Sequence, residues 1–190
     1  MALTLQQIIT EADILVPNAV STADKVIQLS SINADFFSNV KITKVHRFSS
    51  TTAGAVTLPT DIRQKNIDLL QIGPLRYRSL DDSSSPGPLE CFYSFDDTIH
   101  VLTLSPAPYK AGLDCLCRHR RIATTTFTTS NLSATPDAPE EYHWTYILAL
   151  AAWLASVMML TEQAASYETR YRQAWQRANG EFSAGAVTGT

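Results

Sequence analysis

The sequence predicts an α+β fold: a helical bundle, made of an N-terminal αα-hairpin and a long C-terminal helix, with an inserted antiparallel β region. Three observations lead to this prediction. Apolar residues at helical spacing fill the first forty positions, and the same spacing returns after residue 137. Between these segments, from residue 41 to 122, short apolar–polar alternations are separated by turn residues, as in strands joined by hairpins.

The N-terminal hairpin carries a start signal for each of its two helices. Thr4 followed by Gln7 is a capping-box pattern, and Pro17 ends the first helix. Ser21 and Asp24 repeat the start signal for a second helix that runs to about Val40. The apolar positions on the two faces are Leu5, Ile8, Ile9, Ala12 and Leu15, then Val26, Leu29, Phe36 and Phe37.

The β region reads as two hairpins and a final strand. The first hairpin, Leu69 to Ser79, turns at Gly73-Pro74, and the second, Cys91 to Thr103, turns at Asp96-Asp97. The stretch from Asp81 to Pro88 is a polar loop rich in Ser, Pro and Gly. The last strand runs from Leu113 to Ile122.

One helix is predicted from residue 137 to 179, with Gly180 as its end and residues 180–190 as a flexible tail. Glu168 and Arg172 form an i,i+4 pair in the favourable order. The apolar run Tyr146–Leu160 is 15 residues long, shorter than the ~20 that span a bilayer, so we read it as buried helix.

Composition narrows the class of protein. The chain has 190 residues, enough for one domain, and a net charge of −3, which does not indicate a surface that seeks nucleic acid. The three cysteines are an odd number, and we read them as reduced, in a chain made and folded in a cytosol. No Gly-rich phosphate loop, Gly-x-Ser-x-Gly or His-Glu-x-x-His motif is present, and the two Asp-Asp pairs lie in turns, so we predict no catalytic residue and no cofactor.

Two groups of side chains on the last predicted strand invite a binding role. Cys115, Cys117 and His119 alternate and so share one face, where His100 or Cys91 could complete a zinc site. Zinc knuckles usually have two to four residues between their cysteines, so buried small side chains are the alternative, and we assign no metal.

The second group is the basic cluster Arg118, Arg120 and Arg121. It could contact DNA phosphates, pair with a neighbouring subunit, or form an ordinary solvated face.

The second half of the long helix carries Tyr167, Tyr171, Arg172 and Trp175. Tyr, Trp and Arg are the residue types enriched at interface hot spots, so these positions are candidate subunit contacts. Packing within the chain explains them equally well.

The ordered series of segments resembles the head-to-tail connector (adaptor, or head completion) proteins of tailed bacteriophages. Almost the whole chain takes part, and the tail tubular protein A of short-tailed phages is similar in layout. The segments are the N-terminal helical pair, Ala53–Ile62, Ile67–Gly73, the Phe92–Leu104 hairpin, Ser105–Pro108, and Ala138–Tyr142 opening the helix that carries Tyr167 and Tyr171.

This resemblance implies a structural virion protein that forms a ring, usually twelvefold, beneath the portal. The ring would extend the DNA channel, let double-stranded DNA pass without sequence specificity, and offer a platform to the stopper or tail. The protein would sit in the virion neck after assembly in the host cytoplasm, without a membrane. The docking segment on the portal would be the C-terminal end, Gly180, Glu181, Phe182 and Ser183, and one of the two hairpins would face the tail.

Two alternatives make different predictions. A DNA-binding module on Arg118, Arg120 and Arg121 predicts steeply salt-dependent affinity for free duplex DNA. A zinc-dependent module on Cys115, Cys117 and His119 predicts stoichiometric zinc and loss of the fold with a chelator.

Overall fold

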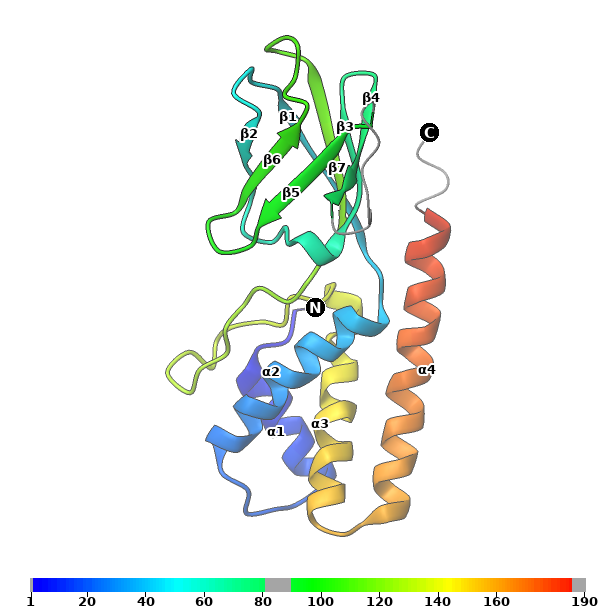
Figure 1. Cartoon of the computed structure of the whole chain (residues 1–190). Coiled ribbons are helices and arrows are strands. Elements are labelled where there is room, and N and C mark those ends of the chain that lie inside the picture. The colour runs from blue at the N-terminus through cyan, green and yellow to red at the C-terminus, as the bar shows by residue number, and fades with distance from the viewer. Residues whose placement is uncertain (1, 81–89, 186–190) are drawn as a thin grey trace. The chain divides into compact units, whose positions relative to one another are not determined.

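The structure, a computed structural model, describes residues 2–80 and 90–185, so the predicted loop at 81–88 lies outside the described residues (Figure 1). It has the predicted α+β composition. The chain divides into two compact units, which we call the helical unit (Met1–Lys41 and Ile122–Thr190) and the sheet unit (Ile42–Arg121).

The N-terminal αα-hairpin is confirmed. Helix α1 spans Leu5–Leu15 and α2 spans Thr22–Asn39. The Thr4 side chain accepts a hydrogen bond from the Gln7 amide N–H, and the Gln7 side-chain oxygen accepts one from the Thr4 amide N–H, so the capping box forms as predicted.

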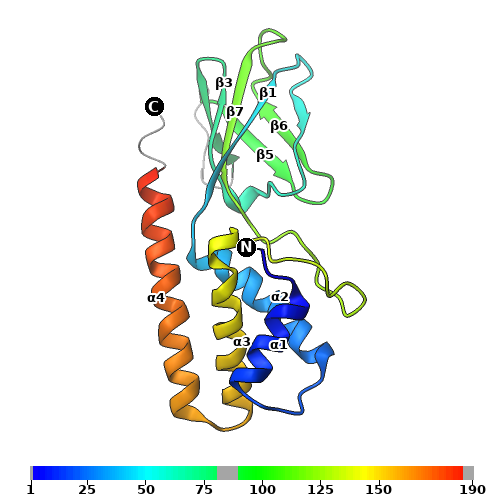
Figure 2. The same cartoon turned by 180° about the vertical axis from the view of Figure 1, so that it is seen from behind.

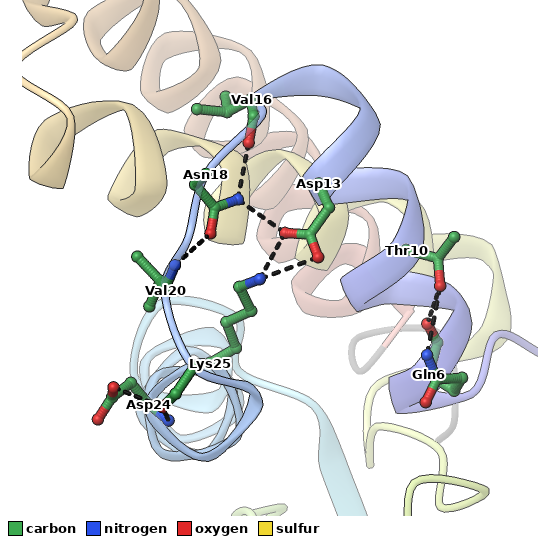
Figure 3. A network of polar contacts seen from close by, with 9 residues as sticks. Gln6, Thr10, Asp13, Val16, Asn18, Val20, Asp24 and Lys25 are labelled. Carbon is green, nitrogen blue, oxygen red and sulfur yellow. Dashed lines mark hydrogen bonds and ion pairs between the residues drawn. The ribbon is translucent and has the colours of Figure 1, made fainter.

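An ion pair between a buried lysine and a partly exposed aspartate joins these two helices. Lys25 is 4% exposed, and its ammonium lies 2.7 Å from the Asp13 carboxylate. Asn18, in the loop between the helices, also donates to Asp13, at 2.8 Å, while its amide oxygen accepts from Val20 N–H (Figure 3). The carboxylate therefore satisfies the buried charge and fixes the course of the loop.

The prediction of one unbroken helix from 137 to 179 is wrong. A 3₁₀ turn, η3 (Glu140–Tyr142), leads into α3 (His143–Val157), and a separate helix, α4 (Thr161–Gly185), folds back beside it (Figure 1). In the described part of the chain, no helix combines the length and apolarity needed to cross a membrane.

The break between α3 and α4 is a left-handed turn at Met159, whose φ is 59°. The Met159 N–H donates to Ser156 O at 3.0 Å and the Leu160 N–H donates to Ala155 O at 2.8 Å, which is the Schellman pattern of helix ends. Glycine usually occupies this position. Because methionine occupies it here, the sequence carries no breaker signal.

The predicted end of the last helix at Gly180 is also wrong, because α4 continues to Gly185. The Tyr142 hydroxyl donates to Glu181 Oε2 at 2.6 Å, and the Phe182 ring lies 6.1 Å from the Tyr142 ring. Through these two contacts with Tyr142, at the start of α3, the residues after Gly180 remain part of helix α4. Of the predicted flexible tail, residues 180–185 are therefore helical, and 186–190 lie outside the described residues.

The sheet unit holds a seven-stranded curled sheet in the order β1-β7-β3-β4-β5-β6-β2. Both predicted hairpins form, β3 with β4 and β5 with β6. The final strand is β7, and it pairs with β1 on one side and β3 on the other. The strands are β1 (Thr43–Ser49), β2 (Ala55–Thr57), β3 (Ile67–Ile72), β4 (Leu75–Ser79), β5 (Phe92–Asp96), β6 (Val101–Ser105) and β7 (Asp114–Arg120), with a 3₁₀ turn η1 (Gln64–Asn66) before β3.

The sheet is mixed rather than antiparallel as predicted, because β4 and β5 pair in parallel through Arg78 with Phe92 and Ser79 with Tyr93. A parallel pair needs a connection of about a dozen residues, and β4 and β5 are far enough apart in the sequence, Ser79 to Phe92, to allow one. The core between the curled faces is apolar and includes Leu70, Tyr77, Leu102 and Cys117.

Candidate interaction surfaces

The aromatic residues predicted for the subunit interface lie mostly in the core of the helical unit. Trp175 is 2% exposed and Tyr171 is 8% exposed, and their rings meet edge to face with centroids 4.8 Å apart. Trp175 also packs edge-on against Phe36 of α2, at 5.5 Å. In this chain the two rings therefore pack internally.

A chain of polar contacts fixes the Trp175 side chain in that core. Its indole N–H donates to the Thr145 hydroxyl at 2.9 Å, and the hydroxyl donates in turn to the Tyr142 carbonyl at 2.6 Å. Thr145 is fully buried. The indole thus couples α4 to the first turn of α3, and this side chain serves the fold.

The other two predicted interface residues are more accessible. Tyr167 is half-buried and Arg172 is exposed. The predicted pair is present: Arg172 Nε donates to Glu168 Oε1 at 2.7 Å, and its guanidinium lies 5.5 Å from the centre of the Tyr171 ring.

Tyr171, Arg172 and Trp175, but not Tyr167, border a groove of about 390 Å³ inside the helical unit. Its floor is α3, where Ala149, Ala152 and Trp153 line it, and its walls are α2 and α4. The Glu168–Arg172 pair stands on the α4 wall. Because Ala149 and Ala152 have small side chains, space remains between α2 and α4.

A second exposed feature of the helical unit is apolar. The turn between α3 and α4 presents Met158 at 45%, Met159 at 89% and Leu160 at 41% of their full exposure. Sequence reasoning missed this corner because it placed all three residues inside a continuous helix. Exposed neighbouring apolar side chains of this kind mark contact surfaces more often than isolated ones do.

The predicted docking segment, Gly180, Glu181, Phe182 and Ser183, forms the last described turns of α4. Burial, and next the carboxylate of Glu181, raise the pKa of Tyr142 to about 12, so the phenol stays protonated and keeps donating to Glu181. Gly180 and Ser183 are exposed, whereas Phe182 is half-buried.

On β7 the predicted alternation is confirmed: Cys115, Cys117 and His119 are buried, and Arg118 on the opposite face is exposed. Arg120 is half-buried, its Nε lies 3.2 Å from an Asp68 carboxylate oxygen, and its Nη2 donates to the Lys65 carbonyl at 3.0 Å.

Arg121 is half-buried, and its amide donates to Ile42 O at 2.8 Å. Of the three arginines proposed for DNA or subunit contact, only Arg118 is exposed, while the Arg120 guanidinium is engaged within the sheet unit.

The cysteine thiols on the buried face of β7 are in poor condition for binding a metal. Burial raises the pKa of the Cys117 thiol to about 12 and raises that of Cys115, whereas metals bind the thiolate. Burial lowers the pKa of His119 and so keeps its imidazole neutral, which leaves the protonated thiols as the obstacle to a metal at this face. Across residues 2–80 and 90–185, no group of three or more His, Cys, Asp or Glu side chains is placed to hold a metal ion.

The described surfaces include a groove, an apolar corner and a long polar helix, which are candidate contact surfaces for other proteins. Comparison with protein families agrees with such a role, since the family model described as SU10 adaptor protein matches residues 3–189, nearly the whole chain. The chain belongs to the SU10 adaptor protein family, an adaptor family of phage. No curated protein matches the chain.

Membership gives the chain a structural adaptor role in the phage particle, with other capsid or tail proteins as its partners. It also points to a non-enzymatic protein.

Proposed function

We propose that the protein forms the head-to-tail connector ring beneath the portal, extends the DNA channel and gives the stopper or tail a surface to bind. The observation that carries this proposal is the adaptor-family match across residues 3–189. In this role the chain binds proteins through its helical unit, and DNA passes the ring without sequence-specific contacts.

The portal end of the protein is, in this proposal, the C-terminal end of α4. Helix α4 is 25 residues long, about 37 Å, and its last described turn carries the exposed Ser183. The Tyr142–Glu181 hydrogen bond anchors that part of α4 to η3, so the proposed docking residues 180–183 are held at a fixed point. A docking segment that starts from a fixed point loses less conformational entropy on binding.

Native mass spectrometry of the purified chain mixed with the portal ring of its own phage tests the proposal. We expect a portal-bound ring of about twelve copies. The matched variant ends at Gly185, which keeps α4 and the Tyr142–Glu181 contact. It should fold like the full chain but bind the portal at least tenfold more weakly.

A full-length chain that stays monomeric in the presence of the portal would refute the connector role. If such a chain instead bound duplex DNA with an affinity that falls steeply with salt, the DNA-binding alternative would take its place. The variant that tests the DNA-binding alternative is Arg118→Ala, because Arg118 is the exposed arginine of its cluster.

A further inference from the structure

The outward charge of the α1–α2 pair is entirely acidic. Residues 1–40 contain one base, Lys25, and four acids, Glu11, Asp13, Asp24 and Asp35. Lys25 is buried and its ammonium is taken up by Asp13. The other three acids are exposed, so no cation on these forty residues offsets them at the surface.

The two helices of this pair present the same short pattern outward. On α1, Glu11 precedes Ile14 by three residues, and on α2, Asp24 precedes Ile27 by three, a spacing that places each pair on one helix face. Both isoleucines are 67% exposed, although isoleucine is among the residues most often buried. Each helix therefore shows solvent an acid beside a large apolar side chain.

Helix α4 carries the opposite charge on one flank. Arg170 and Arg177 are seven residues apart, two turns or about 10.5 Å, and lie on one side of the helix. Both are exposed, and within the described part of the chain neither has an ion-pair partner. Glu181, by contrast, accepts from Tyr142.

The acidic and basic surfaces lie on different helices of the helical unit. Helix α3 stands between α1 and α4 when the molecule is seen from the front and from behind (Figure 1, Figure 2). A closed ring is built from a heterologous contact, in which one surface of each subunit meets a different surface of the next. Two different, complementary surfaces on one unit meet this requirement.

We propose that the outward face of the α1–α2 pair binds the Arg170–Arg177 flank of α4 on a second copy of this chain. The acids Glu11 and Asp24 pair with the two arginines, and the neighbour's helix covers Ile14 and Ile27. The inference rests on the proposed ring and names its lateral contact. The occupant follows from charge complementarity, since both halves are present on every copy.

Charge reversal on each half tests the contact. Variant one is Arg170→Glu with Arg177→Glu, and variant two is Glu11→Arg with Asp24→Arg. In either variant both halves carry the same sign, so neighbours repel. We expect each variant alone to need at least tenfold more protein than wild type to fill the portal ring, measured by native mass spectrometry.

A mixture of the two variants should recover. The acidic α4 of variant one meets the basic α1–α2 pair of variant two, and the basic α4 of variant two meets the acidic pair of variant one. The mixture should therefore form portal-bound rings at wild-type concentration with equal numbers of the two chains, which misfolded chains could not do. Arg76→Glu, an exposed arginine of β4 in the sheet unit, is the control and should assemble normally.

The outcomes separate the two proposals. If wild type forms the ring and both variants form it equally well, or if the mixture fails as each variant does, the lateral contact is wrong and the connector role stands. If wild type forms no ring on the portal, the connector role itself fails.

Discussion

The helical unit and the sheet unit bury polar side chains in different ways. In the helical unit several buried polar side chains bond to one another across helices: the Tyr146 hydroxyl donates to Asn33 Oδ1 at 2.8 Å and the Trp175 indole donates to Thr145. In the sheet unit they bond mainly to backbone: Asn66 Nδ2 donates to the Arg120 carbonyl at 2.6 Å, and Ser50 donates to the Lys110 carbonyl at 2.9 Å.

The backbone explains this difference. Helices satisfy their own peptide groups, so a polar side chain buried between helices bonds either to backbone at a helix end, as Thr145 does at the Tyr142 carbonyl, or to another side chain. Loops and strand ends leave peptide groups without a regular partner, and polar side chains such as Asn66 provide one. The helical unit is therefore held in register by pairs of residues far apart in sequence, such as Asn33 and Tyr146.

The largest expected effect breaks such a pair in the helical unit. Trp175→Ala removes a large buried ring and leaves the Thr145 hydroxyl without the indole donor, so we expect a loss of about 3–5 kcal/mol in the free energy of unfolding. Trp175→Phe keeps most of the volume and should cost about 1–2 kcal/mol. Urea unfolding followed by circular dichroism at 222 nm measures both, and a Trp175→Phe variant as stable as wild type would contradict a role for the hydrogen bond.

The next largest effect concerns Asp137. Its side chain links the segment that follows the sheet unit in sequence, at Thr124 and Thr125, to Asn33 of α2. Its carboxylate accepts from Asn33 Nδ2 at 2.8 Å and from the amides of Thr124 and Thr125 at 2.9 Å each. Burial alone would raise the pKa of Asp137, but hydrogen bonds from Thr125, Asn33 and Thr124 outweigh it and leave the pKa below its ordinary value.

A lowered pKa in the folded state means that the stabilisation is present above the ordinary carboxyl pKa and is lost as the pH falls through the folded value. We therefore expect wild type to lose stability below about pH 4. Asp137→Asn should lower the free energy of unfolding at pH 7 by about 2–3 kcal/mol and flatten that acid dependence. Melting curves recorded between pH 3 and 7 test this prediction. If the melting temperature of the variant falls with pH as steeply as that of wild type, a group other than Asp137 causes the acid dependence.

The sheet unit should respond differently, through its apolar core. Cys117 is fully buried there with a thiol pKa of about 12. Cys117→Ser places a hydroxyl in an apolar core and should lower the free energy of unfolding by about 1–3 kcal/mol. Cys117→Val keeps the site apolar and should lower it by less than about 1.5 kcal/mol. A metal chelator should leave the melting temperature of wild type unchanged. A fall of several degrees with the chelator would revive the zinc hypothesis.

The sequence predicted the elements whose local signals agree with their environment. The capping box at Thr4, the Gly73-Pro74 turn and the alternation of Cys115, Cys117 and His119 all appear as expected, because each depends on neighbours in the chain. The parallel pairing of β4 with β5 was out of reach, since strand direction depends on where the segment 80–91 leads the chain.

The candidate interface was only partly predictable for a related reason. An aromatic stripe on a helix has the same pattern whether it faces the chain's own core or a neighbour. Only the fold back of α4 onto α3 shows that Tyr171 and Trp175 face inward, and only the burial of Lys25 leaves the α1–α2 pair acidic on its outer side.

The smallest expected effect concerns the missed turn at Met159. A non-glycine residue in the left-handed region costs roughly 1–2 kcal/mol, and the Met159 side chain is 89% exposed, so burial returns little of that cost. Met159→Gly should raise the free energy of unfolding by up to about 1 kcal/mol, because glycine accepts this backbone but is more flexible when unfolded. Met159→Ala keeps the Cβ and should give no gain. If thermal melts show that glycine destabilises the chain, the exposed methionine has packing partners in solution, and the apolar corner would become a contact surface in its own right.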